Sequence, residues 1–379
     1  MTTLLREKRA AQAAILDLTE SNPTHAGLAY PKEEILGALS DARSLHYDPD
    51  PRGLLSAREA VSGYYAARGV SVDPSHIILT ASTSEAYAYL FKLLTNPGDD
   101  VLVPQPSYPL FEYLAAMESV AVRPYPLRYD GAWHIDFDAL EKATGERTRA
   151  IAIVNPNNPT GSFIKKDEWA RLAEWACSRN ISVLSDEVFS DFAFAPDPTR
   201  VSTLADATGA SVFAMSGLSK IAGLPQMKLG WIVANGPDHA AALDGLEWIA
   251  DTFLSVSTPV QLGLDRLLAA GQLIRDQIRR RTASNLAIAR ETFGSTSKCQ
   301  ILRAEGGWYI VLQIPRTRSE EAWALGLLGD AEVLIQPGFF YDFGSEAHIV
   351  VSLLPEASVF REGVRRISEY IEGVFHGPH

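Results

Sequence analysis

The stretch Met215-Ser-Gly-Leu-Ser-Lys-Ile-Ala-Gly-Leu-Pro-Gln-Met-Lys-Leu-Gly230 contains one central lysine, Lys220, between two apolar segments at residues 212–215 and 229–233. If both segments are buried, the lysine is partly desolvated, and desolvation favours the neutral amine that attacks a carbonyl carbon. We therefore expect Lys220 to form a Schiff base with an aldehyde cofactor. The alternative is a structural lysine at a strand end that extends its amine into solvent.

Length and charge limit the kinds of protein that this chain could be. Its 379 residues, 46% of them hydrophobic, exceed one ordinary hydrophobic core, so we expect two domains. The formal net charge of −12 argues against a nucleic-acid partner and against an anionic membrane surface. The two cysteines, Cys177 and Cys299, lie far apart and predict neither a disulfide nor a cysteine metal site, and we expect no metal.

The start of the chain bears on its location. Residues 1–9 carry charges where a secretory signal would need an apolar segment. No uninterrupted apolar run approaches the roughly 20 residues that span a bilayer. We therefore expect a cytoplasmic protein that does not associate with membranes.

Apolar segments that alternate with amphipathic segments predict the fold. We expect strands at residues 76–79, 101–103, 150–154, 181–184 and 212–215, with helices between most of them. This alternation predicts an α/β fold with a mostly parallel sheet and helices on both faces. Residues 45–285 would form this large domain, and residues 1–44 and 286–379 a smaller α+β domain. A long helix at residues 259–291 would bridge the two, and we expect further helices at residues 4–14 and 358–375.

Polar side chains follow the carboxyl ends of these predicted strands. They are Ser82, Thr83, Ser84, Tyr108, Asn158, Asp186 and Lys220. In open α/β sheets ligands bind outside these strand ends, so we expect the polar side chains to share one ligand. The amides and hydroxyls of Thr83 and Ser84, which begin a helix, could hold a phosphate, with ordinary helix capping as the alternative.

The other members of this set suit a charged aromatic ring. Asp186 could pair with a protonated ring nitrogen, and a partner arginine is the alternative. Asn158, in a loop bounded by prolines, could donate to a ring oxygen or could simply be a turn residue. Tyr108 could stack on the ring or could simply be packed. The sequence contains no dinucleotide-binding, Walker-type or His-Glu-x-x-His motif that would favour another chemistry.

Three motifs in this order and spacing resemble a known family. They are Asn155-Pro-Asn-Asn-Pro-Thr-Gly161, Ser185-Asp-Glu187 and Ser219-Lys220…Gly230. The chain resembles the fold-type I, class I/II aminotransferases that use pyridoxal phosphate and are related to aspartate aminotransferase, from about Leu18 to about Leu354. The resemblance implies transfer of an amino group between an amino acid and a 2-oxo acid through the Lys220 Schiff base.

Other activities remain open from the sequence alone. A pyridoxal-phosphate lyase, decarboxylase or cyclase that acts on an amino acid would share the same attachment to Lys220. A non-catalytic effector-binding domain related to aminotransferases is a further alternative, although no basic DNA-binding extension precedes residue 20.

The resemblance also implies a role for each candidate. Lys220 would be catalytic and would move the proton from the substrate Cα, while Asp186 would keep the ring nitrogen protonated. Tyr47 would reach a phosphate in the neighbouring subunit, which implies a homodimer with shared active sites. Ser21 would lie in the substrate site. The other cofactor ligands would be Ser82, Thr83, Ser84 and Ser219 on the phosphate, Asn158 on the ring oxygen and Tyr108 on the ring face.

The sequence departs from the family's pattern at three positions, Lys228, Phe189 and Val350. Lys228 stands where an arginine usually binds the phosphate, and we expect it to act there as a cation. Phe189 stands where a tyrosine usually donates to the ring oxygen, so we expect a raised pKa of the Schiff base. Val350 stands where an arginine usually binds the substrate α-carboxylate. Our candidate for that role is Arg52, and a solvated turn arginine is the alternative.

Overall fold

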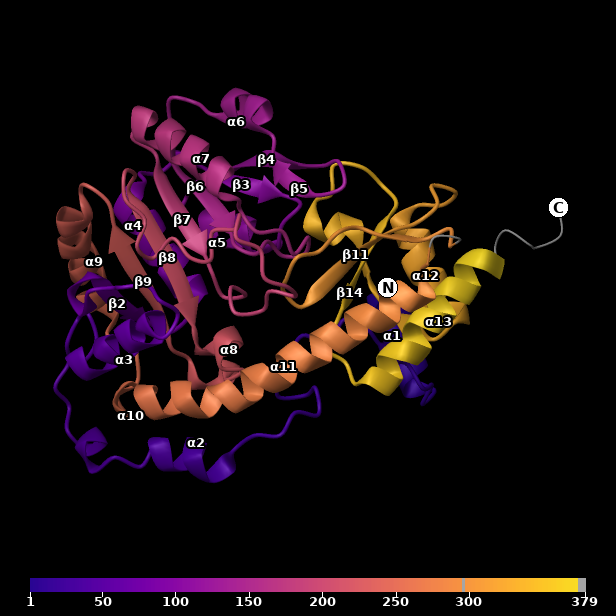
Figure 1. Cartoon of the computed structure of the whole chain (residues 1–379), viewed down its shortest axis with the longest axis horizontal. Helices are drawn as coiled ribbons and strands as arrows, with labels where there is room; N and C mark the ends of the chain where they lie inside the picture. The colour runs from indigo at the N-terminus through magenta and orange to yellow at the C-terminus, as the bar shows by residue number, and fades with distance from the viewer. Residues whose placement is uncertain (295–296, 374–379) are drawn as a thin grey trace.

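The computed structural model describes residues 1–294 and 297–373. Figure 1 shows a large part built around one sheet, a smaller part beside it, and the long helix α11 (Leu264–Thr292) running from one to the other. Among the described residues, no helix is both long and apolar enough to cross a membrane.

The large sheet has eight strands and is mixed. Its order is β2 (Ile77–Thr80), β9 (Gly230–Asn235), β8 (Val212–Gly217), β7 (Ser182–Asp186), β6 (Thr148–Val154), β3 (Asp100–Gln105), β4 (Ala121–Tyr129) and β5 (Trp133–Ile135). The strands from β8 to β4 are mutually parallel, whereas β9 is antiparallel to both of its neighbours and β5 is antiparallel to β4.

Helices cover both faces of this sheet, as the sequence predicts. The helices of this part are α3 (Leu55–Ala66), α4 (Thr83–Leu94), α5 (Leu110–Met117), α6 (Phe137–Ala143), α7 (Lys166–Arg179), α8 (Leu218–Ile221), α9 (His239–Phe253) and α10 (Thr258–Leu262). Alternate strand residues point to opposite faces. Accordingly Met215 and Phe213 pack with α4 and α9, whereas Ala214 packs with α3, α8 and α11.

The small part contains a four-stranded antiparallel sheet. Its order is β10 (Gln300–Ile301), β11 (Tyr309–Gln313), β14 (His348–Ser352) and β13 (Gln336–Pro337). A separate parallel pair joins β1 (Leu16–Asp17) to β12 (Val333–Leu334), which ties the start of the chain to the small part. Its helices are α1 (Thr2–Ala10), α12 (Glu320–Asp330) and α13 (Ala357–Gly373).

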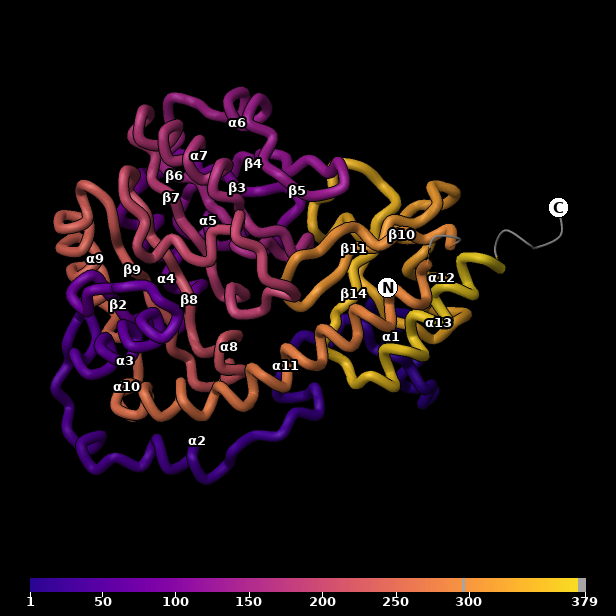
Figure 2. The backbone as a smooth tube through the Cα atoms, in the orientation of Figure 1, coloured from indigo at the N-terminus to yellow at the C-terminus, as the bar shows by residue number. Residues whose placement is uncertain are grey.

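Helix α11 contributes to the cores of both parts. Its first half packs Leu267, Ile274 and Ile278 into the large part, and its last turns pack Leu286 and Ala289 into the small part. Figure 2 shows the N-terminal segment passing beneath α11, where α2 (Lys32–Ala38) packs against it. The domain boundaries expected from the sequence stay a prediction.

Several local expectations were wrong or incomplete. The single helix expected at residues 259–291 is broken at Gly263, where a Cβ would lie 2.4 Å from the carbonyl oxygen of Ala38. The helix expected at residues 4–14 ends at Ala10. Strands β4 and β5 were not foreseen. The last two residues of the helix expected at residues 358–375 lie outside the described residues.

Candidate functional site

The candidate residues follow consecutive strand ends along one edge of the large sheet. The order β2-β9-β8-β7-β6-β3 places the ends of β2, β8, β7, β6 and β3 side by side. Backbone hydrogen bonds tie these ends together, from the Asn155 N–H to the Asp186 carbonyl (2.8 Å) and from the Glu187 N–H to the Met215 carbonyl (2.8 Å). These ends lead, respectively, into the segments of Ser82, Lys220, Asp186, Asn158 and Tyr108.

Two glycines allow the lysine segment to approach the turn after β2. Gly217 and Gly230 pair across β8 and β9, and a Cβ on Gly217 would lie 2.8 Å from the Gly230 Cα. A Cβ on Gly230 would lie 3.0 Å from the Ser216 carbonyl oxygen and 3.2 Å from the Ser82 carbonyl carbon. A side chain at either glycine would therefore push apart the segments that carry Ser82 and Lys220.

The amine of Lys220 lies among aromatic rings. Its Nζ is 5.0 Å from the ring centroid of Trp308 and 5.8 Å from that of Phe189. Burial lowers the pKa of Lys220 from its usual value, and the negative charge of Asp186 opposes this shift. The fraction of neutral amine is consequently larger than for a solvated lysine, which is the state needed for attack on an aldehyde.

The carboxylate of Asp186 is the complementary group. Burial raises its pKa to about 6, although the Val188 N–H, the Tyr87 hydroxyl and Lys220 each favour the charged form. The Val188 N–H donates to Oδ1 (3.2 Å) and the Tyr87 hydroxyl donates to Oδ2 (3.4 Å). A buried carboxylate with so little compensation is stabilised when a cation binds beside it.

The start of α4 offers unpaired backbone donors. The Ser82 hydroxyl caps the helix by accepting the Glu85 N–H (3.2 Å), so the capping alternative holds for that side chain. Within residues 1–294 and 297–373, the N–H groups of Thr83 and Ser84 have no acceptor. Such amides at a helix N-terminus favour an anion.

Ser219 and Lys228 come from the lysine segment. Ser219 is half-buried at the start of α8, and Lys228 is exposed, with a left-handed backbone (φ 51°), at the end of the short 3₁₀ turn Pro225–Met227. No ion pair to the Lys228 amine occurs within the described part of the chain, so the amine is available to an anion.

Two loops hold Asn158 and Tyr108 near the ends of β6 and β3. The Asn157 side-chain amide donates to the Pro106 carbonyl (3.0 Å), and the Ser107 N–H donates to the Tyr341 carbonyl of the small part (3.0 Å). Asn158 is buried, and its Oδ1 has no partner among the residues described. Tyr108 is 47% exposed, which leaves its ring accessible to a ligand.

Tyr47 and Arg52 lie away from this row of strand ends. Tyr47 is 79% exposed and borders a depression formed with residues of α9 and α10. The guanidinium of Arg52 pairs with Glu247 (2.5 Å) and Asp244 (3.4 Å). Arg52 would have to exchange these partners to bind a substrate carboxylate, so its proposed role stays a prediction that the ion pairs disfavour.

Sequence reasoning missed three residues beside the site. Tyr87 lies one helical turn after Thr83, and this spacing of four residues could have indicated it. Trp308 and Tyr309 lie in the small part and face Phe189, with ring centroids 5.3 Å and 6.3 Å from it. The expected substrate residue Ser21 is half-buried next to Tyr309, where its hydroxyl acts on the tyrosine's pKa.

The buried carboxylate should leave a signature in the cofactor-free protein. With a pKa near 3.8 in the unfolded chain and about 6 in the folded one, Asp186 binds a proton more tightly when folded. The free energy of unfolding should therefore fall by about 3 kcal/mol as pH rises from about 4 through 6. Urea unfolding of the apoprotein across this range should show a fall that Asp186→Asn lacks. Identical pH profiles for the two proteins would contradict the assignment.

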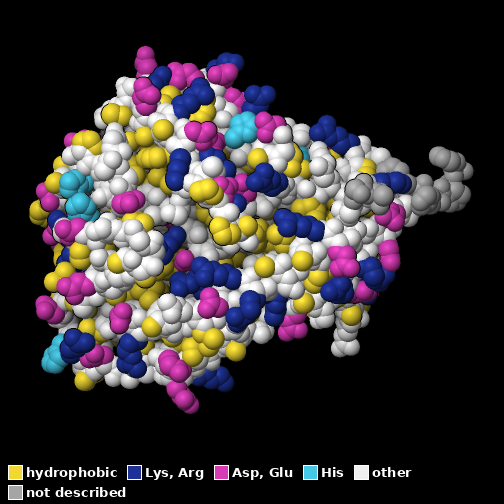
Figure 3. Space-filling model, viewed as in Figure 1, with side chains coloured by type: hydrophobic (Ala, Val, Ile, Leu, Met, Phe, Trp, Pro, Cys, Tyr) yellow, Lys and Arg dark blue, Asp and Glu magenta, His cyan; other side chains and the backbone are white. Residues whose placement is uncertain are grey.

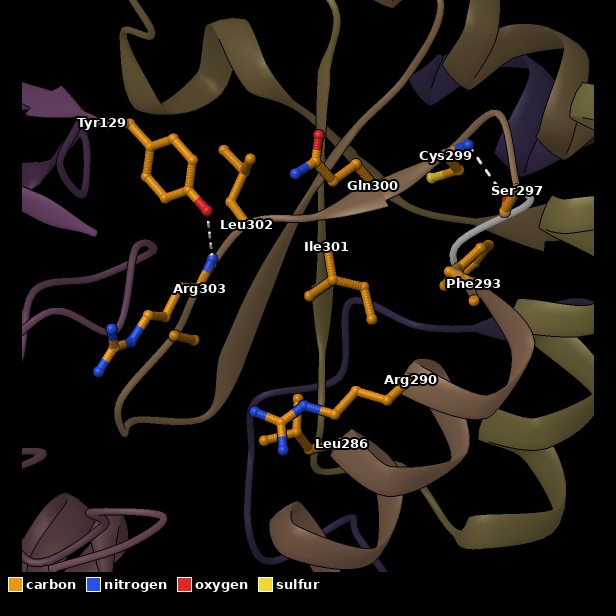
Figure 4. Close-up of a pocket in the computed structure, with 12 residues that line it drawn as sticks. Tyr129, Leu286, Arg290, Phe293, Ser297, Cys299, Gln300, Ile301, Leu302 and Arg303 are labelled. Carbon is orange, nitrogen blue, oxygen red and sulfur yellow. Dashed lines mark hydrogen bonds between the residues drawn. The ribbon is translucent and has the colours of Figure 1, made fainter. Parts of the chain in front are cut away.

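A sizeable cavity lies away from this row of strand ends. It has a volume of about 520 Å³ between the end of α11 and β10, and it shares no lining residue with the strand-end site. Figure 4 shows Arg290 and Arg303 beside it and the hydrogen bond from the Arg303 N–H to the Tyr129 hydroxyl (3.1 Å). We assign no role to this cavity. In the described part of the chain, no group of three or more His, Cys, Asp or Glu side chains is placed to hold a metal ion.

Comparison with known proteins gives consistent matches over most of the chain. The family described as Aminotransferase class I and II matches residues 13–367. Glutamate-pyruvate aminotransferase AlaA of Escherichia coli K12 is 27% identical over 368 residues, covering 95% of this chain and 91% of that protein. Mouse tyrosine aminotransferase is 26% identical over 387 residues, covering 98% and 84%. The crystal structure of an aminotransferase from Escherichia coli superposes with a TM-score of 0.86 at 25% identity, covering 98% and 94%.

Proposed function

The chain belongs to the Aminotransferase class I and II family, and from this membership we propose the part that each site residue plays. It is a pyridoxal-phosphate-dependent enzyme that transfers an amino group between an amino acid and a 2-oxo acid. The fold class expected from the sequence is likewise that of its structural relatives.

The residues at the strand ends suit pyridoxal phosphate. A half-buried lysine with a lowered pKa suits its aldehyde, a half-buried carboxylate with a raised pKa suits its ring nitrogen, and the free amides of Thr83 and Ser84 suit its phosphate. When bound, the cofactor supplies an aldehyde carbon that takes up the amino group and a ring that withdraws electrons. Every other contribution comes from the side chains and backbone amides of this chain.

In this proposal Lys220 holds the cofactor covalently and then moves a proton from the substrate Cα. Its short distance to two aromatic rings keeps water away, so the amine stays a competent base. Asp186 holds a proton on the ring nitrogen, and the Tyr87 hydroxyl orients the carboxylate. Asn158 donates to the ring oxygen and Tyr108 stacks on the ring.

The phosphate would be held at the other end of the site. Ser82, Thr83, Ser84, Ser219 and Lys228 would bind it, with Lys228 as a point charge rather than a guanidinium fork. Ser82 would contribute chiefly by fixing the helix start, since its hydroxyl already accepts the Glu85 N–H.

These assignments rest on two groups, the Lys220 amine and the Asp186 carboxylate, which come from the carboxyl ends of the neighbouring strands β8 and β7. Burial disfavours the charged form of Lys220 and of Asp186. Their mutual attraction opposes this effect, as do the hydrogen bonds that Asp186 accepts from the Val188 N–H and the Tyr87 hydroxyl. Adding an amino acid without an acceptor to the cofactor-loaded enzyme should convert the aldehyde absorbance into that of the amine form. A 2-oxo acid should restore it. Release of ammonia without this conversion would instead indicate elimination.

We also propose a homodimer with shared sites. Tyr47 is 79% exposed, and several large apolar side chains are exposed as well, among them Leu45, Trp248 and Phe253. Apolar side chains exposed in this number favour a protein–protein contact. In the dimer, Tyr47 of one chain would reach the phosphate bound in the other.

Mixed dimers test the sharing of sites. Tyr47→Phe removes one hydrogen bond to a charged group and should weaken cofactor binding by about 10–100-fold. In a mixed dimer of one Tyr47→Phe chain and one Lys220→Ala chain, one site would combine the native Lys220 of the first chain with the native Tyr47 of the second. Tight cofactor binding at half the sites is the expected result. Binding no tighter than in the Tyr47→Phe homodimer would show that Tyr47 does not act across the dimer.

Two further assignments belong to the same proposal. We place the large domain at residues 45–285 and the small one at residues 1–44 and 286–379, with α11 as their link. We place the protein in the cytoplasm, and the absence of a disulfide between Cys177 and Cys299 is compatible with that location.

A further inference from the structure

One face of the small sheet forms a wall of the site. Along β11 and β14, alternate residues point in opposite directions. Ile310, Leu312, Ile349 and Val351 pack into the core of the small part, under α12 and α13. Tyr309, Val311 and Val350 instead pack into the core that contains Phe189 and Trp308, the two rings beside Lys220.

This wall carries no charge where the family's pattern places an arginine. Val350 is fully buried and lies between Val311 on β11 and Gln336 on β13. The Gln336 side-chain oxygen accepts a hydrogen bond from the Tyr341 hydroxyl. The Gln336 amide and the Tyr341 hydroxyl are therefore neutral polar groups of the wall. His348, two residues before Val350 on the same face of β14, has its pKa lowered by burial, which favours the neutral imidazole.

A buried donor without a partner lies beside the reactive amine. Trp308 is fully buried, and its indole Nε1 has no hydrogen-bond acceptor in the described part of the chain. Its ring is held edge-on by Phe189 (5.3 Å) and Phe192 (5.2 Å), and the ring centroid is 5.0 Å from the Lys220 Nζ. An unpaired buried N–H is costly, and a bound ligand with an acceptor removes that cost.

The neighbouring Tyr309 is a second neutral donor. Burial raises its pKa to about 12, and the charges of Tyr108 and Glu20 raise it as well, while the Ser21 hydroxyl opposes the shift. The Tyr309 hydroxyl therefore stays protonated at neutral pH. The Glu20 carboxylate of the N-terminal segment is among the groups that raise this pKa, and a negative charge disfavours a second one nearby.

We propose that the substrate's α-carboxyl group is bound by two neutral hydrogen-bond donors, the Trp308 N–H and the Tyr309 hydroxyl. The negative charge of the carboxylate is then not required for binding, and α-amino acid amides are also substrates. This inference rests on the proposed function. It makes Trp308 a specificity-determining residue, because it supplies the hydrogen bond that a guanidinium would otherwise supply. An amide oxygen accepts these hydrogen bonds as a carboxylate oxygen does, whereas a guanidinium strongly favours the charged carboxylate.

The half-reaction on an amide balances without an added oxidant. The substrate loses its Cα–H and its Cα–N bonds, and water supplies the oxygen of the resulting 2-oxo amide. The nitrogen and two electrons pass to the aldehyde carbon of the cofactor, which becomes the amine form. A 2-oxo acid then reverses this exchange and restores the aldehyde.

Paired substrates provide the test. Alanine with alaninamide, and tyrosine with tyrosinamide, are compared in the single half-reaction followed by cofactor absorbance, with rates referred to the concentration of free amine. The acid and its amide should differ by less than tenfold in kcat/KM. A preference for the acid of tenfold or more would overturn the inference. If no amine or amino acid converts the cofactor, the proposed function itself fails, which is a different result.

Two variants locate the effect. Trp308→Phe keeps the ring and removes the N–H, and it should raise KM for acid and amide alike by about three- to tenfold with kcat little changed. An unchanged KM would overturn the role of Trp308. Val350→Arg should shift the acid-to-amide ratio of kcat/KM at least tenfold toward the acid, and Val350→Met, of similar length and neutral, should leave the ratio unchanged. If Val350→Arg does not fold, the Trp308→Phe result decides.

Discussion

Replacing Lys220 by alanine is expected to lower the rate of the amino-group half-reaction by about 10⁴-fold, the upper end of what a positioned acid–base group contributes. In the proposed mechanism the same amine both holds the cofactor and moves the substrate proton, so both functions would be lost together. The apolar segments on either side of the lysine, at residues 212–215 and 229–233, are buried, and alanine fits the short helix α8 without strain. The loss should therefore be chemical rather than structural.

Matched measurements separate these two causes. Lys220→Arg retains a positive charge but does not present a neutral amine, so it should be nearly as slow as Lys220→Ala. Both variants should unfold at a temperature close to that of the native apoprotein. A Lys220→Ala enzyme within tenfold of the native rate would place the reactive amine elsewhere in the chain.

The second large effect concerns the carboxylate on the neighbouring strand. Asp186→Asn keeps the shape of the side chain and its acceptor for the Val188 N–H and the Tyr87 hydroxyl. It removes the negative charge that would hold a proton on the ring nitrogen. Removing one partner of a buried charge pair costs about 3–5 kcal/mol, which corresponds to a loss of about 10²–10⁴-fold in turnover.

The control for this variant is Asp186→Glu. It keeps the charge but displaces it by one methylene group, so it should retain more activity than Asp186→Asn. The two apoproteins should also differ, because only the variant without a carboxyl group lacks the stability loss between pH 4 and 6 that burial of Asp186 imposes. Asp186→Asn with native turnover and a native pH profile would remove this residue from the site.

The positions of the main site residues could be predicted from the sequence for a physical reason. Asn158, Asp186 and Lys220 each follow a short apolar run, and buried parallel strands end at a common edge of a sheet. The structure places their strands next to one another. Local sequence was sufficient because the strand, its end and the polar residue are contiguous in the chain.

Other features could not be predicted because they depend on contacts between distant segments. The direction of β9 follows from the tight return after Lys220, where Leu218 N–H donates to the Leu229 carbonyl (2.9 Å). The break at Gly263 follows from the approach of Ala38. Trp308 reaches Lys220 only because the small sheet packs against the large part, which no local pattern indicates.

The positively charged side chains are distributed unevenly over the surface. Although the chain is acidic overall, Figure 3 shows Lys and Arg side chains gathered across the middle of one face. Arg275 and Arg279 of α11 pair with the buried Asp191 (3.4 and 3.6 Å), and Arg275 also donates to the Ile221 carbonyl next to Lys220. These arginines brace the lysine segment against α11.

The most direct test of this account is chemical trapping of the cofactor on the chain. The cofactor-loaded enzyme is reduced with borohydride, digested, and its peptides are mapped by mass spectrometry. The account predicts one modified peptide, with the reduced cofactor attached to Lys220. A stable adduct on another lysine, or none in an enzyme that contains the cofactor, would contradict it.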